Sequence, residues 1–325
     1  MRGALLVAFC ALTGCTRSEE TRHASPPEEV PSAAAKPPAP DPPGSGAPAP
    51  PPAPSLSMSE RTWHFDTPFG PNEVVVLVPE GAARDAALPV LVAFHGRGES
   101  LKGPKRGARG WVQDYALGAA VSRLGAPPLS PADFGGMVDP KHLAEINRSL
   151  GTTPYRGLIV VCPFLPDFLK GREAIPQGQM LARFIVEDVL PRVYRETPAA
   201  GTPQTTSVDG VSLGGRASLL VGWLRPEAFG AVAALQPALD SDEAGFFAEL
   251  ARTAHEKNHE QKVRLLTSTE DYFLGPTQKL ASALGARELP HQIDVVVGTH
   301  TYEFNRGPGV YEMLIFHDRA LRGAP

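Results

Sequence analysis

The chain has few cysteines, no excess of basic residues and no long apolar run, and each shortage excludes a class of protein. Three cysteines in 325 residues are too few for a disulfide framework. Lys and Arg number 31 against 35 Asp and Glu, a net charge of −4, so the chain lacks the electrostatic footprint that nucleic-acid binding needs. Its first apolar stretch, residues 3–12, is about half of the roughly 20 residues that a spanning helix requires. We therefore expect no nucleic-acid partner and no permanent transmembrane helix.

The first residues have the pattern of an export signal. A basic start at Met1-Arg2 precedes the apolar stretch, and residues 12–15, Leu-Thr-Gly-Cys, form a small-residue processing site. This site resembles the lipobox of bacterial lipoproteins, which implies removal of residues 1–14, acylation of Cys15 and a place on the cell envelope, facing the periplasm or the exterior. An ordinary secretory signal is the alternative. Cys10 would leave with the leader, and Cys162, inside an apolar run, is expected to be an inert core residue.

Residues 15–57 have the composition of a tether. Thirteen prolines fall between Pro26 and Pro54, interleaved with Ala, Ser and Gly, and almost no large apolar residue accompanies them. Such a segment cannot bury a core. We therefore predict a lipidated cysteine and linker over 15–57, followed by one folded domain over 58–325.

The folded part alternates short apolar runs with amphipathic stretches. A strand pair is predicted near 63–65 and 73–78. Helices are predicted over 180–194, with a kink at Pro191, and over 213–224 and 309–321. Strands that alternate with helices predict an α/β fold with a mostly parallel central sheet, helices on both faces and ligands bound beyond the carboxyl ends of the strands. The further strands are predicted at 89–94, 158–162, 207–211, 231–235, 263–267 and 293–297.

The segment 101–156 is too long for a simple connection between strands. We expect one helix over 111–124 and then an insertion, 125–150, that is rich in turn residues. The insertion is interpreted either as a lid that overhangs the site or as a surface elaboration.

A serine between glycines is the most informative motif. Residues 210–214 read Gly-Val-Ser-Leu-Gly, with Gly215 next, where an apolar run gives way to a helix-compatible one. This is the sequence form of a nucleophile elbow, a sharp strand-to-helix turn that needs small neighbours and lifts Ser212 out of the sheet.

A serine needs a histidine as base, and the histidine needs a carboxylate to orient it. Asp271 follows the strand predicted at 263–267 and His300 follows the strand at 293–297, both at the edge where Ser212 lies. The order serine, acid, base is that of hydrolases with this architecture. Glu270 is a rival for the acid, and Asp240 and Asp242 are weaker rivals.

The oxyanion of an acyl-transfer intermediate needs two backbone donors. Leu213 supplies the first candidate, and the turn after the strand 89–94 supplies the second through Gly96 or Arg97. His95 is expected to brace this turn rather than act as the base.

Residues 94–96, 210–215 and 298–301 together resemble the α/β-hydrolase superfamily, in particular the group of esterase D, feruloyl and acetylxylan esterases and enterochelin esterase. The likeness runs from about residue 58 to the end, although the insertion 125–150 has no counterpart. It implies hydrolysis of a small or polymer-borne carboxylic ester through an acyl-serine carried by Ser212, Asp271 and His300, with no cofactor. Substrate preference does not transfer, and the oligomeric state stays open.

Two other function classes compete. Residues 255–259 match the H-E-x-x-H spacing of zinc peptidases, with His255 and His259 as ligands and Glu256 as base, but polar neighbours on both sides indicate a solvated helix end. A catalytically silent hydrolase fold that binds a partner is the second alternative. The turn after the strand 89–94, residues 95–98, is called the oxyanion turn below. The basic residues that follow it are interpreted as a solvated loop or, alternatively, as a site for an acidic substrate group. They are Lys102, Lys105, Arg106 and Arg109.

Overall fold

The computed structural model describes residues 56–168 and 174–322. The predicted leader, the lipidation site Cys15 and nearly all of the tether lie outside these residues. Within the described ranges, every helix is too short or too polar to cross a bilayer.

Eight strands form one sheet in the order β1-β2-β4-β3-β5-β6-β7-β8. Strand β2 runs antiparallel to both β1 and β4, and the six strands from β4 to β8 in this order are parallel to one another. The mostly parallel sheet and the initial strand pair are therefore confirmed. The strands are β1 Met58–Thr67, β2 Gly70–Pro79, β3 Val90–Phe94, β4 Ile159–Pro163, β5 Thr206–Gly210, β6 Ala231–Leu235, β7 Lys262–Glu270 and β8 Gln292–Thr299.

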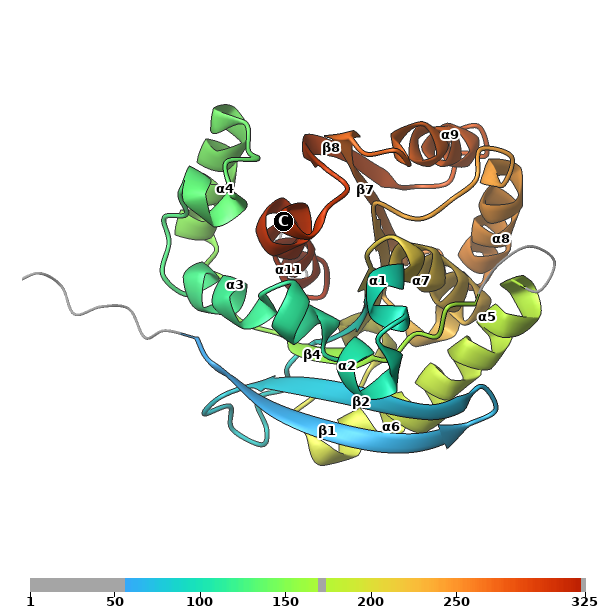
Figure 1. Ribbon diagram of the computed structural model, residues 1–325, viewed down its shortest axis with the longest axis horizontal. Helices are drawn as coiled ribbons and strands as arrows, with labels where there is room; N and C mark the ends of the chain where they lie inside the picture. The colour runs from blue at the N-terminus through green and yellow to red at the C-terminus, as the bar shows by residue number, and fades with distance from the viewer. Residues whose placement is uncertain (1–55, 169–173, 323–325) are drawn as a thin grey trace, which may run out of the picture. The chain divides into compact units, whose positions relative to one another are not determined.

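The central strands are buried on both faces, which explains their continuous apolar sequences. In β3, Val90 and Val92 point into one core and Leu91 and Ala93 into the other, because successive side chains alternate across a sheet. Helices α5 to α9 pack on the first face, and α3 and α11 on the second (Figure 1). The predicted layers are thus confirmed.

The helices between the strands vary in regularity. The longer ones are α3 Leu117–Leu124, α4 Pro140–Thr152, α5 Ala174–Arg183, α6 Leu190–Glu196, α7 Leu213–Leu224, α8 Ala244–Lys257, α9 Leu274–Gly285 and α11 Val310–Ala320. Short helices are α1 Arg97–Ser100, α2 Gly103–Gly107 and α10 Tyr302–Phe304, and π-helical turns cover Gly110–Asp114, Phe184–Val189 and Asn305–Gly309.

The helix predicted over 180–194 contains a π-helical segment instead of a simple kink. Pro191 has no N–H to donate and its ring crowds the carbonyl four residues back. The π-helical turn Phe184–Val189 ends just before Pro191 and accommodates both the missing N–H and the bulk of the ring. In this turn the Leu190 N–H donates to the Ile185 carbonyl, five residues back.

The helix predicted over 111–124 is also interrupted, because Ala116 adopts the left-handed conformation at φ 55°. The chain turns there between the π-helical turn Gly110–Asp114 and α3. Only the second half of the prediction is a regular α-helix.

The insertion 125–150 has turns and irregular chain over residues 125–139, but residues 140–150 belong to helix α4. This helix begins at an Asp139 cap that accepts from two backbone N–H groups, with Pro140 at the first helical position. Its apolar face, Leu143, Ile146 and Leu150, joins the core with α3 and α11. The lid interpretation is wrong, because apolar burial fixes this segment against α11 and none of its residues lines the candidate site described below.

An ion pair ties α4 to α11. His142 lies 2.5 Å from Glu312, and this hydrogen bond raises the pKa of His142 above its ordinary 6.5 despite partial burial. Burial opposes ionisation of Glu312, but His142 and Arg264 hold the pKa of Glu312 below 4.5. Between pH 5 and 9, therefore, the titrating partner of the pair is His142.

We expect this pair to make stability depend on pH in a defined direction. Because the pKa of His142 is higher in the folded chain than its ordinary 6.5, the pair stabilises the fold fully below pH 6.5. This stabilisation is lost as the pH rises through the pKa of His142 in the folded chain. The melting temperature of the native chain should exceed that of His142→Gln at pH 5.5 to 6, and the excess should shrink by pH 9. A constant difference across this range, measured by calorimetry in parallel, would contradict the assignment.

Candidate active site

The carboxyl ends of four parallel strands bring the predicted site residues to one edge of the sheet. Ser212 follows β5, Gly96 follows β3, Asp271 follows β7 and His300 follows β8. Except for the buried Asp271, they line a cavity of about 620 Å³. This is the place where open α/β sheets bind their ligands.

Ser212 occupies a strained turn between β5 and α7. Its φ of 58° and ψ of −116° lie outside the regions that side-chain-bearing residues favour. Its backbone is held on both sides, because Ser212 N–H donates to Leu235 O at 3.0 Å while Ser212 O accepts from Ala238 N–H at 2.9 Å. The strand-to-helix elbow predicted from the sequence is present, with the serine at its apex.

The elbow has no space for side chains at two of its glycines. A Cβ on Gly214 would lie 2.4 Å from the carbonyl oxygen of Phe94, and one on Gly210 would lie 2.5 Å from the Gly214 backbone. Both obstacles are main chain, which cannot swing aside as a side chain can.

We expect Gly214→Ala to destabilise the fold by about 3 kcal/mol or more, because a Cβ there forces β3 and α7 apart. Gly118→Ala is the matched control, since Gly118 is an exposed helical glycine of α3 with open space around its would-be Cβ. That change should be neutral or slightly stabilising. Chemical denaturation of both variants measures the difference, and equal stabilities would contradict the steric argument.

Asp271 and His300 form a hydrogen-bonded pair. His300 Nδ1 lies 2.9 Å from Asp271 Oδ1, which also accepts from the Phe273 N–H at 2.9 Å, while Asp271 Oδ2 accepts from the Thr267 hydroxyl at 2.7 Å. The side chain of Asp271 is fully buried. With Nδ1–H donating to the carboxylate, His300 keeps Nε2 as the acceptor that a base needs.

The other carboxylates considered as the acid form no hydrogen bond or ion pair with His300 in the described part of the chain. Glu270 is exposed at the end of β7, and Asp240 and Asp242 are exposed beyond β6, although Asp240 lines the cavity. The structure pairs only Asp271 with His300 among the described residues.

Ser212 and His300 face the same cavity without a direct bond. Among residues 56–168 and 174–322, no hydrogen bond joins the Ser212 hydroxyl to the His300 ring, whose neighbours are Tyr272 and Phe273 at ring distances of 4.3 and 5.3 Å. In ligand-free enzymes, catalytic hydrogen bonds are often long and tighten only when substrate binds.

Leu213 N–H is the first of the candidate oxyanion donors. It is the first helical residue of α7, whose initial N–H groups have no partner within the helix. In a trans peptide the N–H points opposite to the preceding C=O. Because Ser212 O bonds the N–H groups of Arg216 and Ala238, the direction of the Leu213 N–H is fixed.

Of the two candidates for the second donor, the geometry favours Arg97. Gly96 N–H already donates to the Tyr115 hydroxyl at 3.1 Å. The His95 ring is buried, accepts from Leu165 N–H at 2.9 Å through Nε2 and therefore donates from Nδ1 to Gly96 O at 2.9 Å. Burial lowers the pKa of His95, consistent with this neutral form. His95 thus holds the Gly96 carbonyl and so fixes the direction of the N–H of Arg97 in the same peptide group. Arg97 is the first residue of α1.

The H-E-x-x-H segment does not form a two-histidine helical face. Helix α8 ends at Lys257, so His255 lies in its last turn and His259 lies beyond it. The two rings pack edge to face at 4.9 Å, and Glu256 pairs with Arg252. No group of three or more His, Cys, Asp or Glu side chains within the described ranges is arranged to hold a metal ion.

The basic residues after the oxyanion turn are partly neutralised. Lys102 pairs with Asp114 at 2.9 Å and Arg109 pairs with Glu60.

Cys162 is a free, buried residue of β4, and burial raises the pKa of its thiol, as expected for an inert core cysteine.

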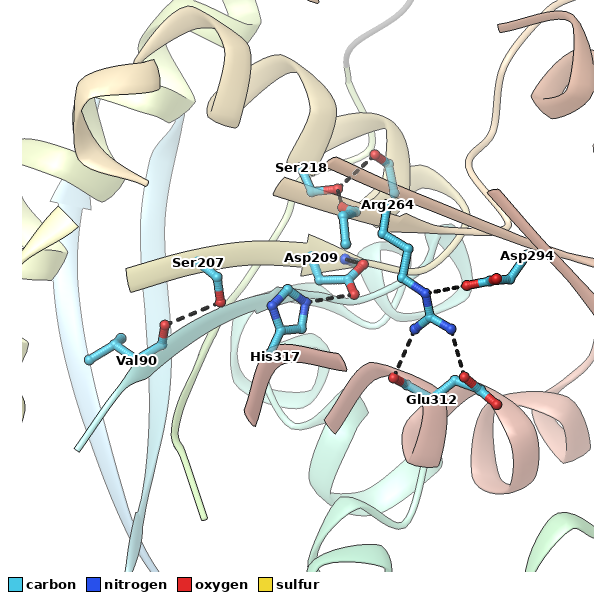
Figure 2. Close-up of polar contacts among 11 residues, drawn as sticks. Val90, Ser207, Asp209, Ser218, Arg264, Asp294, Glu312 and His317 are labelled. Carbon is cyan, nitrogen blue, oxygen red and sulfur yellow. Dashed lines mark hydrogen bonds and ion pairs between the residues drawn. The ribbon is translucent and has the colours of Figure 1, made fainter. Parts of the chain in front are cut away.

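A largely buried set of polar contacts connects β5, β7 and β8 with α11 (Figure 2). Asp209 of β5 accepts from Gly210 N–H at 2.7 Å and pairs with His317 of α11 at 3.0 Å. Beside it, Arg264 of β7 bridges Asp294 and Glu312, each at 2.6 Å. Through the Asp209–His317 pair, the network ties β5, the strand that precedes Ser212, to α11.

Sequence reasoning missed the aromatic and acidic wall of the cavity. Tyr272 and Phe273 flank His300, and Glu99, Tyr115 and Tyr302 lie together near the oxyanion turn. The only available signal was position, since Tyr272 follows the acid directly and Tyr302 lies near the base.

Comparisons with known proteins give one match to a protein-family model and several to solved structures. Residues 172–308 match the esterase family model, described as "Putative esterase". No curated protein matches the chain.

Solved structures share the fold at low identity. A ferulic acid esterase is 15% identical with a TM-score of 0.60, over 82% of this chain and 99% of that chain. S-formylglutathione hydrolase FrmB of Staphylococcus aureus is 12% identical with a TM-score of 0.56, over 80% and 99%. The fluorophosphonate-binding serine hydrolase FphF of the same organism is 11% identical with a TM-score of 0.57, over 81% and 99%. At these identities the likeness shows a common fold.

Proposed function

We propose that this chain, an α/β-hydrolase of the esterase group, cleaves carboxylic esters through an acyl intermediate on Ser212. The observation that carries the proposal is the Asp271–His300 pair at the rim of the cavity that the strained Ser212 also lines. A neutral imidazole oriented by a buried carboxylate supplies the base that a serine hydroxyl lacks.

The reaction follows from these groups. Ser212 Oγ attacks the ester carbonyl carbon while His300 Nε2 takes the hydroxyl proton, and the carbonyl oxygen becomes an oxyanion between the N–H groups of Leu213 and Arg97. Collapse breaks the bond to the alcohol oxygen, which receives the proton from His300. A water molecule then repeats the sequence, loses its proton to His300 and releases the acid and free Ser212. Asp271 stabilises the imidazolium in both halves.

Hydrolysis of short-chain p-nitrophenyl esters by the native chain, with and without a chelator, tests the proposal. Turnover that resists the chelator and disappears in Ser212→Ala supports it. Turnover abolished by the chelator would instead favour metal chemistry at His255 and His259. Absence of turnover with all acyl lengths would favour a catalytically silent binding module.

We further propose that a lipid on Cys15 anchors the enzyme to the cell envelope, with residues 15–57 as the spacer. The Leu-Thr-Gly-Cys site and the proline-rich composition support this arrangement. The full chain expressed in a bacterial host should incorporate labelled palmitate and fractionate with membranes, whereas Cys15→Ser should do neither. Membrane fractionation of Cys15→Ser at the native level would contradict the anchor.

A further inference from the structure

Glu99 accepts hydrogen bonds from two sides of the candidate site. Its side chain is buried in α1, directly after the oxyanion turn. Tyr115 donates to Oε2, Tyr302 donates to Oε1 at 2.6 Å, and Lys102 Nζ lies 3.4 Å from Oε1. Glu99, Tyr115 and Tyr302 are called the Glu99 clasp below.

The charge of Glu99 sets the direction of every bond in the clasp. A carboxylate has only acceptor oxygens, so both phenols must donate to it. Burial, followed by the effect of Glu99, raises the pKa of Tyr115 well above its ordinary value and that of Tyr302 to about 12, so both phenols keep their protons. The Tyr115 oxygen is then left to accept, and it accepts from Gly96 N–H at 3.1 Å.

The clasp joins the loop of the base to the oxyanion turn. Tyr302 follows β8 closely after His300, whereas Glu99 follows β3. The contact is close, because a Cβ on Gly98 would lie 2.5 Å from the Tyr302 hydroxyl. A shift of either loop therefore has to break the bond between Tyr302 and Glu99 or move the other loop.

The clasp also determines which amide remains for the oxyanion. Tyr115 takes the Gly96 N–H, and His95 holds the Gly96 carbonyl at 2.9 Å, so both ends of this residue are fixed. The adjoining Arg97 N–H is then held in one direction, and Arg97 lines the cavity. Hydrogen-bond donors that are already oriented stabilise the transition state because they need not reorient as negative charge develops on the carbonyl oxygen.

We propose that Glu99, Tyr115 and Tyr302 are positioning residues that hold the Arg97 N–H for the oxyanion and couple this turn to the His300 loop. The inference rests on the proposed esterase function. It assigns to three residues a role that acts on the transition state without contact with the reacting atoms.

Tyr115→Phe is the primary test, with Tyr155→Phe as the matched control, because the Tyr155 hydroxyl is buried with no hydrogen-bond partner among the described residues. In Tyr115→Phe, kcat for p-nitrophenyl butyrate should fall roughly 10- to 100-fold while KM stays within about twofold, because only the oxyanion interaction is weakened. Tyr155→Phe should keep both constants. Tyr302→Phe, which alters a partly exposed side chain, should lower kcat in the same sense without a risk to folding.

A pair of ketones separates positioning from a general structural effect. A trifluoromethyl ketone adds to the active serine as a hemiketal with an oxyanion, whereas the matching methyl ketone binds mainly as a ground-state analogue. The inhibition constant of the trifluoromethyl ketone should rise with the loss of kcat in Tyr115→Phe and Tyr302→Phe, and that of the methyl ketone should not change. Equal changes for both ketones, or an unchanged kcat in both variants, would overturn the proposal.

The outcome distinguishes this inference from the proposed function. If the native chain shows no Ser212-dependent turnover, the esterase proposal itself is wrong. If the native chain is active and both phenylalanine variants keep its kcat and its trifluoromethyl ketone affinity, only the clasp is wrong.

Discussion

Ser212→Ala should lower kcat for ester hydrolysis by a factor on the order of 10⁵ to 10⁶, with little change in melting temperature. The elbow backbone is held by main-chain bonds to Leu235 and Ala238, so removal of the hydroxyl leaves the turn in place. The loss arises because His300 and the two N–H donors then have no nucleophile to assist. We expect a small residual rate over water from the proposed oxyanion donors alone.

Steady-state kinetics together with calorimetry measure this effect. Ser282→Ala, at an exposed serine of α9, is the control and should keep full activity. A Ser212→Ala variant that retains more than about one hundredth of the native kcat would show that another group performs the attack.

Asp271→Asn should lower kcat by about 10⁴-fold, while Glu270→Gln should change it less than about twofold. An asparagine amide can donate to His300 Nδ1, which would place the ring proton on Nε2, the nitrogen that must accept from Ser212. Asp271 is buried and bonded to His300, whereas Glu270 is exposed.

The ranking of these two variants decides which carboxylate is the acid. Both substitutions remove one negative charge from neighbouring positions, so each controls for the general electrostatic effect of the other. A larger loss in Glu270→Gln than in Asp271→Asn would reassign the acid and contradict the geometry.

The sequence predicted the sheet, and the sheet edge at which Ser212, Asp271 and His300 lie, because these depend on local patterns. Buried parallel strands need continuous apolar runs, and the elbow needs glycine at Gly210 and Gly214 where main chain approaches closely. Asp271 was predicted from its place after a strand, but its preference over Glu270 depended on the direction of each side chain, which adjacent positions in a sequence do not reveal.

The errors lie where contacts between distant segments decide the structure. Helix α4 had a start signal, Asp139 followed by Pro140, but the turn residues of the insertion favoured an irregular segment, and the packing of α4 in the core with α3 and α11 has no local signal. The Glu99 clasp unites residues 99, 115 and 302, a combination with no local pattern.

The measurement that tests the central claim most directly is peptide mapping of the chain after reaction with a fluorophosphonate, which forms a P–O bond with an activated serine and releases fluoride. The claim is that Ser212, His300 and Asp271 act as one catalytic unit. It predicts one adduct per chain, on the peptide that contains Ser212, and its loss in His300→Gln. An unmodified native chain, an adduct on another residue, or labelling that is undiminished in His300→Gln would contradict it.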